Sequence, residues 1–419
     1  MSGPAGVDRL VVVGASLAGL TAAHALRDHG FAGRLTLVGD EVHEPYDRPP
    51  LSKSVLSGRL PAERTTLPRA VDLDAEWLLG VPATGLDRPG RRVLLADGRD
   101  LEYDRVLIAT GTRARPWPDP AGALDGVFTL RTCDDAARLR SRLAAKPARV
   151  LVIGAGFTGS EIASVCRELG LAVTVAERGA APLAGPLGSD LGAVAARRQR
   201  AHGVDLRCHT SVLSLDGDRS GRLRRAWLSD GSALDVDVAV VALGAVRNVE
   251  WLSGSGLSVD PRGVVCDPTC RVVDVDGVTQ DDVFVAGDAA RWPHPLCDDK
   301  LIAVEHWGNA VEQARVAAHN MVCETEQRRT HQPLPAFWSH QFGVNIKSVG
   351  FPSYADQVVL TQGSVAAGRF TAAYGRRGRM VGAVAVDMPR NLDAYAALIR
   401  AGAPFPPDLH APDQPSDEE

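Results

Sequence analysis

Two stretches of this chain share one pattern: an apolar strand, a glycine-rich turn and the start of an alanine- and leucine-rich helix. The first runs from Leu10 to Gly19 and the second from Val150 to Gly159. In such a turn, glycine allows the sharp bend and lets the backbone approach a phosphate, while the helix N-terminus offers free N–H groups to its negative charge. Each stretch therefore predicts a site for the pyrophosphate of a dinucleotide.

The glycine positions of the two turns differ at one place. The second turn has a glycine at all three positions, Gly154, Gly156 and Gly159. The first has only the outer two, Gly14 and Gly19, because Ser16 takes the middle position. Serine is compatible with a pyrophosphate there only if its small side chain points away from the phosphates.

An acidic residue ends the strand that follows each turn and helix. Asp40 and Glu41 come after the first of these strands, and Glu177 comes after the second. A carboxylate here accepts hydrogen bonds from ribose hydroxyls, which makes a chance match of the glycine pattern less probable. Because a carboxylate repels a 2′-phosphate, Glu177 predicts NADH rather than NADPH, although the adjacent Arg178 would favour the phosphate.

The composition is that of a large enzyme without a nucleic-acid or membrane partner. The 419 residues are 45% hydrophobic and can form two or three domains, and the net charge of -5 gives no overall basic field. No apolar run approaches the roughly 20 residues of a membrane span, and no charged leader precedes the first strand, so we expect a cytoplasmic protein.

The seven cysteines form no CxxC pair, and we expect them to be reduced. Cys266 and Cys270 are the only close pair, and their spacing predicts two ends of a turn. We therefore predict no metal site in this chain.

Two further segments each predict a strand that ends in a turn suited to a cofactor, Leu101–Gly111 and Val283–Asp288. Together with the two glycine turns, they resemble the pyridine-nucleotide flavoprotein reductases, in which an Ala-Thr-Gly turn and a Gly-Asp pair flank FAD. The segment Pro45–Lys53, Pro-Tyr-Asp-Arg-Pro-Pro-Leu-Ser-Lys, resembles the one beside the flavin in bacterial ferredoxin reductases of the putidaredoxin reductase type, including those of aromatic-ring dioxygenases.

The resemblance implies an α/β fold with two Rossmann-like dinucleotide-binding domains, as in glutathione reductase, and a C-terminal α+β domain. The FAD domain would be discontinuous, and a proline-rich linker at 115–120 would lead into the NAD domain. The aromatic residues of 337–342 are expected in the core of the last domain. The implied ranges are 1–115 and 246–328 for FAD, 116–245 for NAD, 329–407 for the C-terminal domain and 408–419 for a disordered acidic tail.

The resemblance also implies the residues of each site. The FAD contacts would be Gly14, Ser16, Ala18, Gly19, Asp40, Glu41, Arg48, Lys53, Ala83, Thr110, Gly111, Arg131, Gly287, Asp288 and Trp307. The NAD contacts would be Gly154, Gly156, Thr158, Gly159, Glu177 and Gly244. Lys53 and Glu161 match positions that approach each other near the reacting rings, and we expect them to be the catalytic pair. The alternatives are a surface lysine, a carboxylate that stabilises a helix start and, for Trp307, a core tryptophan.

The absence of cysteine before Cys133 indicates how electrons leave the flavin. Disulfide reductases of this fold have a redox cysteine pair in that region, and NADH oxidases and peroxidases have a single cysteine. Electrons must then leave the flavin directly, one at a time, and a separate [2Fe-2S] ferredoxin serving a cytochrome P450 or a ring-hydroxylating dioxygenase is the expected acceptor.

The sequence is also compatible with other electron acceptors and with another class of function. The acceptor would otherwise be rubredoxin, a quinone or oxygen, or the chain would be an NADH-responsive binding protein resembling apoptosis-inducing factor. We expect a monomer or a homodimer.

Overall fold

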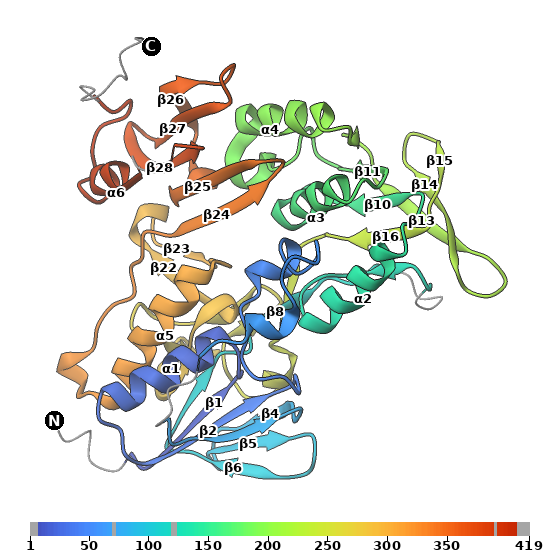
Figure 1. Cartoon of the computed structure of the whole chain (residues 1–419). Coiled ribbons are helices and arrows are strands. Elements are labelled where there is room, and N and C mark those ends of the chain that lie inside the picture. Colours follow the sequence, from blue (N-terminus) through green and yellow to red (C-terminus); the bar gives the residue numbers. More distant parts are fainter. Residues whose placement is uncertain (1–6, 69–72, 119–123, 389–391, 409–419) are drawn as a thin grey trace.

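The structure is a computed structural model that describes residues 7–68, 73–118, 124–388 and 392–408 (Figure 1). Its first unit is built on a six-stranded sheet in the order β20-β21-β7-β1-β2-β3. All neighbouring pairs are parallel except β20 and β21. The strands are β1 (Arg9–Val13), β2 (Arg34–Gly39), β3 (Glu76–Leu79), β7 (Arg105–Ile108), β20 (Arg271–Val273) and β21 (Thr279–Val285).

Alternate residues of β1 pack on opposite faces of this sheet. Leu10 and Val12 face two helices, α1 (Leu17–Asp28) and α5 (Trp307–Val322). Val11 and Val13 face a small antiparallel sheet. Because both faces are buried, the strand is apolar at every one of these positions. The small sheet consists of β4 (Ala83–Asp87), β5 (Arg92–Leu95) and β6 (Asp100–Glu102).

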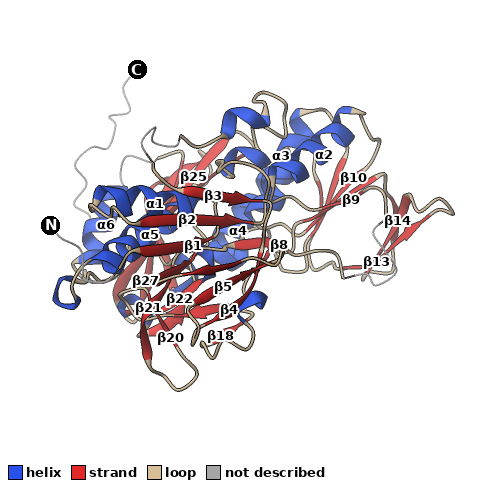
Figure 2. Ribbon diagram, turned by 90° about the horizontal axis from the view of Figure 1, so that it is seen from below, coloured by secondary structure: helices blue, strands red, loops and turns tan. Residues whose placement is uncertain are grey.

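The second unit repeats this arrangement. Its sheet, in the order β12-β11-β10-β16-β9, is parallel throughout, with helices on one face and a three-stranded antiparallel sheet on the other. Figure 2 shows β13 and β14 projecting at the outer end of the molecule. The sheet strands are β9 (Val127–Phe128), β10 (Val150–Ile153), β11 (Val173–Ala176), β12 (Asp205–Arg207) and β16 (Val238–Val241). The remaining elements are α2 (Cys133–Ala144), α3 (Phe157–Glu168), α4 (Ala184–Ala201), β13 (Val212–Gly217), β14 (Leu223–Leu228) and β15 (Ala233–Asp235).

The third unit is an antiparallel sheet in the order β24-β25-β28-β27-β26. One face packs on α6 (Leu392–Arg400) through Tyr395 and Ile399. The other face packs on the start of α4 through Leu183 and Leu187. The strands are β24 (Ala336–Gln341), β25 (Val344–Gly350), β26 (Gln357–Ser364), β27 (Arg369–Arg376) and β28 (Arg379–Val386). The predicted fold class, two dinucleotide-binding α/β domains and an α+β domain, is confirmed.

Two short strands join the α/β units where the chain leaves the first and where it returns. β8 (Thr112–Ala114) pairs antiparallel with β17 (Ala245–Arg247). A small sheet follows, with β18 (Val259–Asp260), β19 (Gly263–Val265), β22 (Ala290–His294) and β23 (Lys300–Ile302). The domain boundaries stay predictions; linker residues 119–120 and tail residues 409–419 lie outside the described residues.

None of the helices in the described part of the chain has the length and apolar character that crossing a bilayer requires. Cys266 and Cys270 lie at the two ends of a turn, as predicted, and both are buried.

Candidate active site

The two glycine turns have the same backbone geometry. Gly14 and Gly154 have φ angles of +120° and +100°, and a Cβ on them would lie 2.1 and 2.5 Å from a carbonyl oxygen of a neighbouring strand end. A Cβ on Gly19 or Gly159 would lie 1.9 or 2.0 Å from the carbonyl oxygen of the first glycine of its own turn. No side chain fits at these four positions, so each requires glycine.

The middle position of each turn faces open space. No atom lies within 4 Å of a Cβ built on Gly156, and Ser16 has the extended backbone of a helix N-cap. The Ser16 Oγ lies 3.5 Å from Nη2 of Arg48 and lines a cavity. This side of the turn is open, so the Ser16 side chain is not buried in the fold; it lies on the cavity side, contrary to the condition that it point away from the phosphates.

Three helices that begin beside this cavity have no side-chain cap. The N-cap residues of α1, α3 and α5 are Ser16, Gly156 and His306, and none of their side chains makes a capping hydrogen bond. In α2, by contrast, Thr132 and Asp135 form a complete capping box. The first N–H groups of α1 and α3 are thus free to donate hydrogen bonds to phosphate oxygens.

A cavity of ≈ 680 Å³ extends from the first glycine turn to the start of α3 and to strand β24. Every residue predicted to contact FAD lines it except Gly19, which lies beneath the turn. Thr158 and Gly244, predicted for NAD, line the same cavity.

A second cavity of ≈ 660 Å³ lies beside the first, and Gly156 lines both. Gly154, Glu177 and Arg178 also line the second cavity. The predicted NAD contacts therefore extend across both cavities, from Glu177 in the second to Thr158 in the first. Gly159 is the exception, because it lies beneath its turn and lines neither cavity. The described residues that line these cavities include no cysteine.

The acidic residues after the two strands are not equivalent. β1 and β10 pair with β2 and β11 in the same register, so Gly39 has the place in the first unit that Glu177 has in the second. A Cβ on Gly39 would lie 2.8 Å from the Cβ of Ala15, which explains the glycine. Asp40 therefore comes one residue later and is exposed, while Glu41 is half-buried. Asp40 and Glu41 therefore lie one and two residues beyond the position that Glu177 has in the second unit.

Glu177 is held by the backbone around it. Its carboxylate accepts hydrogen bonds from the N–H of Ala155, at 2.7 Å, and of Gly179, at 2.6 Å. This fixes the carboxylate beside the second glycine turn, whereas the side chain of Arg178 is exposed.

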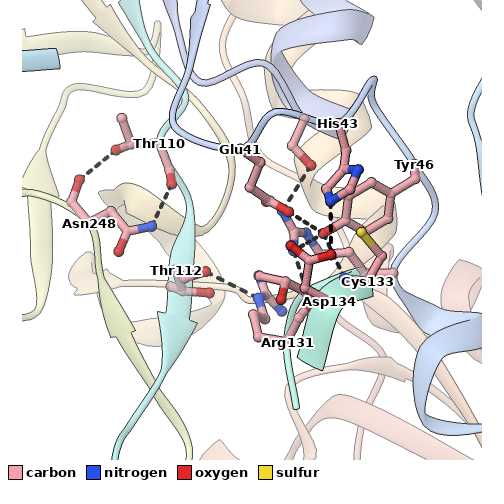
Figure 3. Close-up of polar contacts among 12 residues, drawn as sticks. Glu41, His43, Tyr46, Thr110, Thr112, Arg131, Cys133, Asp134 and Asn248 are labelled. Atoms are coloured by element: carbon pink, nitrogen blue, oxygen red, sulfur yellow. Dashed lines mark hydrogen bonds and ion pairs between the residues drawn. The ribbon is translucent and has the colours of Figure 1, made fainter. Parts of the chain in front are cut away.

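A web of hydrogen bonds forms one wall of the larger cavity (Figure 3). Arg48 donates to Glu41 at 2.5 Å, to the Tyr46 hydroxyl at 3.0 Å and to the carbonyl oxygen of Arg131 at 2.9 Å. Burial raises the pKa of Tyr46, so its hydroxyl stays protonated and donates to Glu41. Arg131 in turn donates to Asp288 at 2.8 Å. The web brings together five side chains from distant parts of the sequence.

The residues that follow β7 and β17 line the same cavity next to this web. Thr110 and Asn248 bond reciprocally, with the Thr110 Oγ1 2.7 Å from the Asn248 carbonyl oxygen and the Asn248 Nδ2 3.0 Å from that of Thr110 (Figure 3). The Thr112 hydroxyl donates to Asp288 at 3.2 Å. Asn248 and Thr112 were absent from the predicted site, since neither belongs to a recognisable motif.

Lys53 and Glu161 form an ion pair with 2.7 Å between Nζ and Oε2. Glu161 lies in the second turn of α3 and is 5% exposed. Its carboxylate also accepts hydrogen bonds from Ser52 at 2.5 Å and from Ser339 at 2.6 Å. The two alternatives, a surface lysine and a carboxylate that only stabilises a helix start, are therefore wrong; the catalytic role stays a prediction.

Aromatic side chains surround the end of the cavity near β24. Trp307 is 38% exposed and Trp338 is 46% exposed, with their ring centroids 6.2 Å apart. Trp307 donates to Asp47 at 2.9 Å, and Phe337 packs on Phe157 with centroids 4.2 Å apart. Trp307 is thus not a core tryptophan.

The expectation that the aromatic residues of 337–342 belong to the core is wrong for Trp338, which is exposed and lines the cavity; Phe337 packs against a core cluster and also lines the cavity. β24 is an edge strand whose residues reach the start of α3. Alternation along the strand was a sequence signal for an exposed face, but it does not say which element that face meets.

Comparison with known proteins decides the family. The family model for pyridine nucleotide-disulphide oxidoreductases matches residues 8–318, and that for the reductase C-terminal domain matches residues 336–416. The chain belongs to the pyridine nucleotide-disulphide oxidoreductase family. Members of this family bind FAD and use NAD(H), so the reductase has FAD as cofactor and NADH as co-substrate, as predicted.

Individual relatives match the reductase over its whole length. It is 35% identical to rhodocoxin reductase of Rhodococcus erythropolis, covering 96% of this chain and 92% of that one. It is 33% identical to the ferredoxin–NAD(+) reductase subunit of the benzene 1,2-dioxygenase system of Pseudomonas putida, covering 96% and 94%. The fold matches that of putidaredoxin reductase in its covalent complex with putidaredoxin, with a TM-score of 0.87, 31% identity and coverage of 95% and 94%. The predicted place among the ferredoxin reductases is confirmed.

Proposed function

We propose that this reductase takes hydride from NADH and passes the electrons singly to a [2Fe-2S] ferredoxin that serves a cytochrome P450 or a ring-hydroxylating dioxygenase. One observation carries the proposal: the two dinucleotide cavities adjoin at Gly156 and Ala242, the Lys53–Glu161 pair lines the larger one, and no cysteine is among the described residues that line them. Bound FAD supplies the chemistry, because a flavin accepts a hydride and gives up electrons one at a time.

The residues of the chain bind and orient FAD and NADH. The turns at Gly14 and Gly154 leave room for the two pyrophosphates. Asp288 and Glu177 each line a cavity, and their carboxylates can accept hydrogen bonds from the hydroxyl groups of the ligands. Lys53, held by buried Glu161, lines the larger cavity, where we expect the flavin and nicotinamide rings to meet. Positioning of this kind supplies most of the rate in a hydride transfer between bound rings.

The end of the cavity that Trp307 and Trp338 line is suited to electron transfer from the flavin to a partner protein. Trp307 and Trp338 are partly exposed at the same place where they line the cavity, so a partner protein that contacts them comes close to the cofactor. The relatives that are ferredoxin reductases, and the putidaredoxin complex, support a ferredoxin as that partner. All seven cysteines are free thiols, which supports a cytoplasmic location; we propose a monomer or a homodimer.

The test compares acceptors under one NADH concentration. With a [2Fe-2S] ferredoxin, rubredoxin, a soluble quinone and oxygen in separate assays, kcat/KM should be at least tenfold higher for the ferredoxin. A higher value for rubredoxin, quinone or oxygen would assign the reductase to that acceptor. Slow flavin reoxidation with all four would favour an NADH-responsive binding protein.

A further inference from the structure

Three side chains with metal-binding atoms gather at the rim of the larger cavity. His43, Cys133 and Asp134 each offer one such atom, and these three atoms all lie within 4.8 Å of one another. The Nε2 of His43 is 3.0 Å from Oδ1 of Asp134. Figure 3 shows the three side chains beside Tyr46.

The cluster joins two segments that are far apart in the sequence. His43 follows β2 in the first unit, whereas Cys133 and Asp134 are the first two residues of α2 in the second. The same segments are already connected, because the Tyr46 hydroxyl accepts a hydrogen bond of 3.1 Å from the Cys133 N–H. The His43 ring also packs edge-on against that of Tyr46, with centroids 6.4 Å apart. The backbone around the three ligand atoms is therefore held in place.

The spacing is close to that of a tetrahedral metal site. With metal–ligand bonds of about 2.0 Å to nitrogen and oxygen and about 2.3 Å to sulfur, ligand atoms lie about 3.3–3.8 Å apart. The most distant atoms need to move by only about 1 Å, and the side chains of His43 and Asp134, 38% and 59% exposed, can do so. Their exposure also leaves a fourth position open to water.

The charges and the donor types favour one class of cation. The carboxylate of Asp134 places a negative charge beside the ligand atoms of His43 and Cys133. A divalent cation would offset this charge and bind the sulfur of Cys133 as a thiolate. Thiolate, imidazole and carboxylate together suit zinc and similar thiophilic ions, while magnesium and calcium prefer oxygen ligands alone.

We propose that His43, Cys133 and Asp134 form a binding site for Zn²⁺ or a similar thiophilic divalent cation. Occupancy links the segment after β2 to the start of α2 across the wall that contains Tyr46 and Arg48. The site is separate from hydride transfer and does not depend on the identity of the electron acceptor.

Zinc binding to the FAD-loaded enzyme tests the site directly. Competition with a chromophoric chelator, read beyond the flavin absorption, should give one Zn²⁺ per chain. Cys133→Ser should weaken the affinity at least 100-fold, and His43→Gln or Asp134→Asn at least tenfold each. The control Cys208→Ser, at another half-exposed cysteine, should leave the affinity unchanged.

X-ray absorption at the zinc edge gives an independent readout. The wild-type protein should show one sulfur neighbour at about 2.3 Å, which Cys133→Ser removes. Zinc affinity within threefold of wild type in Cys133→Ser, or a zinc shell without sulfur, would overturn the site. If Cys133→Ser fails to fold, unchanged affinity in the two variants at exposed side chains, His43→Gln and Asp134→Asn, would overturn it equally.

Discussion

At the scale of single residues, Glu161 connects three segments of the chain beside the larger cavity through hydrogen bonds to Ser52, Lys53 and Ser339. It is a buried carboxylate with three donors, and Lys53 is the only cation among them. Removing the cation leaves a buried charge without its counter-ion, which costs about 3–5 kcal/mol in fully buried pairs. Lys53 keeps a side-chain exposure of 23%, so the cost is lower here.

We expect Lys53→Met to lower the free energy of unfolding by about 2 kcal/mol and to slow flavin reduction by NADH at least tenfold, with FAD still bound. Urea unfolding and anaerobic stopped-flow absorbance measure the two effects. The matched control is Lys347→Met, because Lys347 is exposed on β25. Equal reduction rates in the wild type and Lys53→Met would exclude a role for the lysine.

Glu177 is expected to set the preference for NADH. Its carboxylate is fixed by two backbone N–H groups and repels a 2′-phosphate, so the wild type should use NADH far better than NADPH. Glu177→Ala removes charged hydrogen bonds to the ribose, each worth about 1.5–3 kcal/mol. KM for NADH should rise about 10- to 100-fold while kcat changes little. Steady-state assays with both nucleotides measure this, and equal kcat/KM for NADH and NADPH in the wild type would contradict it.

At the scale of elements, the second strand–turn–helix unit offers a matched pair of variants. Gly154→Ala would place a Cβ 2.5 Å from a carbonyl oxygen at φ +100°, whereas Gly156→Ala meets no atom within 4 Å. The first should distort the turn and reduce NADH affinity at least 100-fold. The second should keep the fold and lose only about tenfold, because its methyl group enters the space of the ligand. NADH titration of the FAD-loaded proteins measures both, and FAD content shows that the first unit is intact. Wild-type NADH affinity in Gly154→Ala would mean that this turn does not hold the nucleotide.

The same elements explain what sequence reasoning found and what it missed. The glycine turns were predictable because their geometry excludes every other residue, and the apolar strands because both faces of each sheet are buried. The strands pair in the same register in both units, but Gly39 takes the position of Glu177, so Asp40 and Glu41 come one and two residues later.

Contacts between distant segments were not predictable. Ser339 reaches Glu161 from an edge strand of the third unit, and His43 meets Cys133 only after the two α/β units have packed together. No local pattern in the sequence predicts either contact. The prediction of no metal site considered only cysteines close in sequence and therefore did not include this cluster.

At the scale of the whole molecule, buried histidines make stability depend on pH. The Nε2 of His331 lies 3.0 Å from Oδ1 of Asn309, and its ring packs on Trp292, where burial lowers its pKa to about 3. Below its unfolded pKa of about 6.5, the unfolded chain binds a proton that the folded chain does not. The folded state therefore loses stability as the pH falls from 7 towards 5.

For His331 alone, the free energy of unfolding should fall by about 2 kcal/mol between pH 7 and pH 5. Burial also lowers the pKa of His294 and His306, so the total loss should be larger. Urea titrations at both pH values of the wild type, His331→Gln and the exposed-site control His340→Gln measure it. The pH-dependent loss should shrink only in His331→Gln; an unchanged loss in that variant would assign the effect to other groups.

The central claim, that electrons enter as hydride from NADH and leave singly to an iron–sulfur partner, is tested most directly by anaerobic two-stage stopped-flow. The FAD-loaded enzyme is first reduced with one equivalent of NADH and then mixed with an excess of oxidised [2Fe-2S] ferredoxin, while flavin and cluster absorbance are recorded. The account predicts rapid flavin bleaching, followed by rapid reoxidation with two clusters reduced per flavin. A flavin that NADH bleaches quickly but that stays reduced in the presence of the ferredoxin would contradict it.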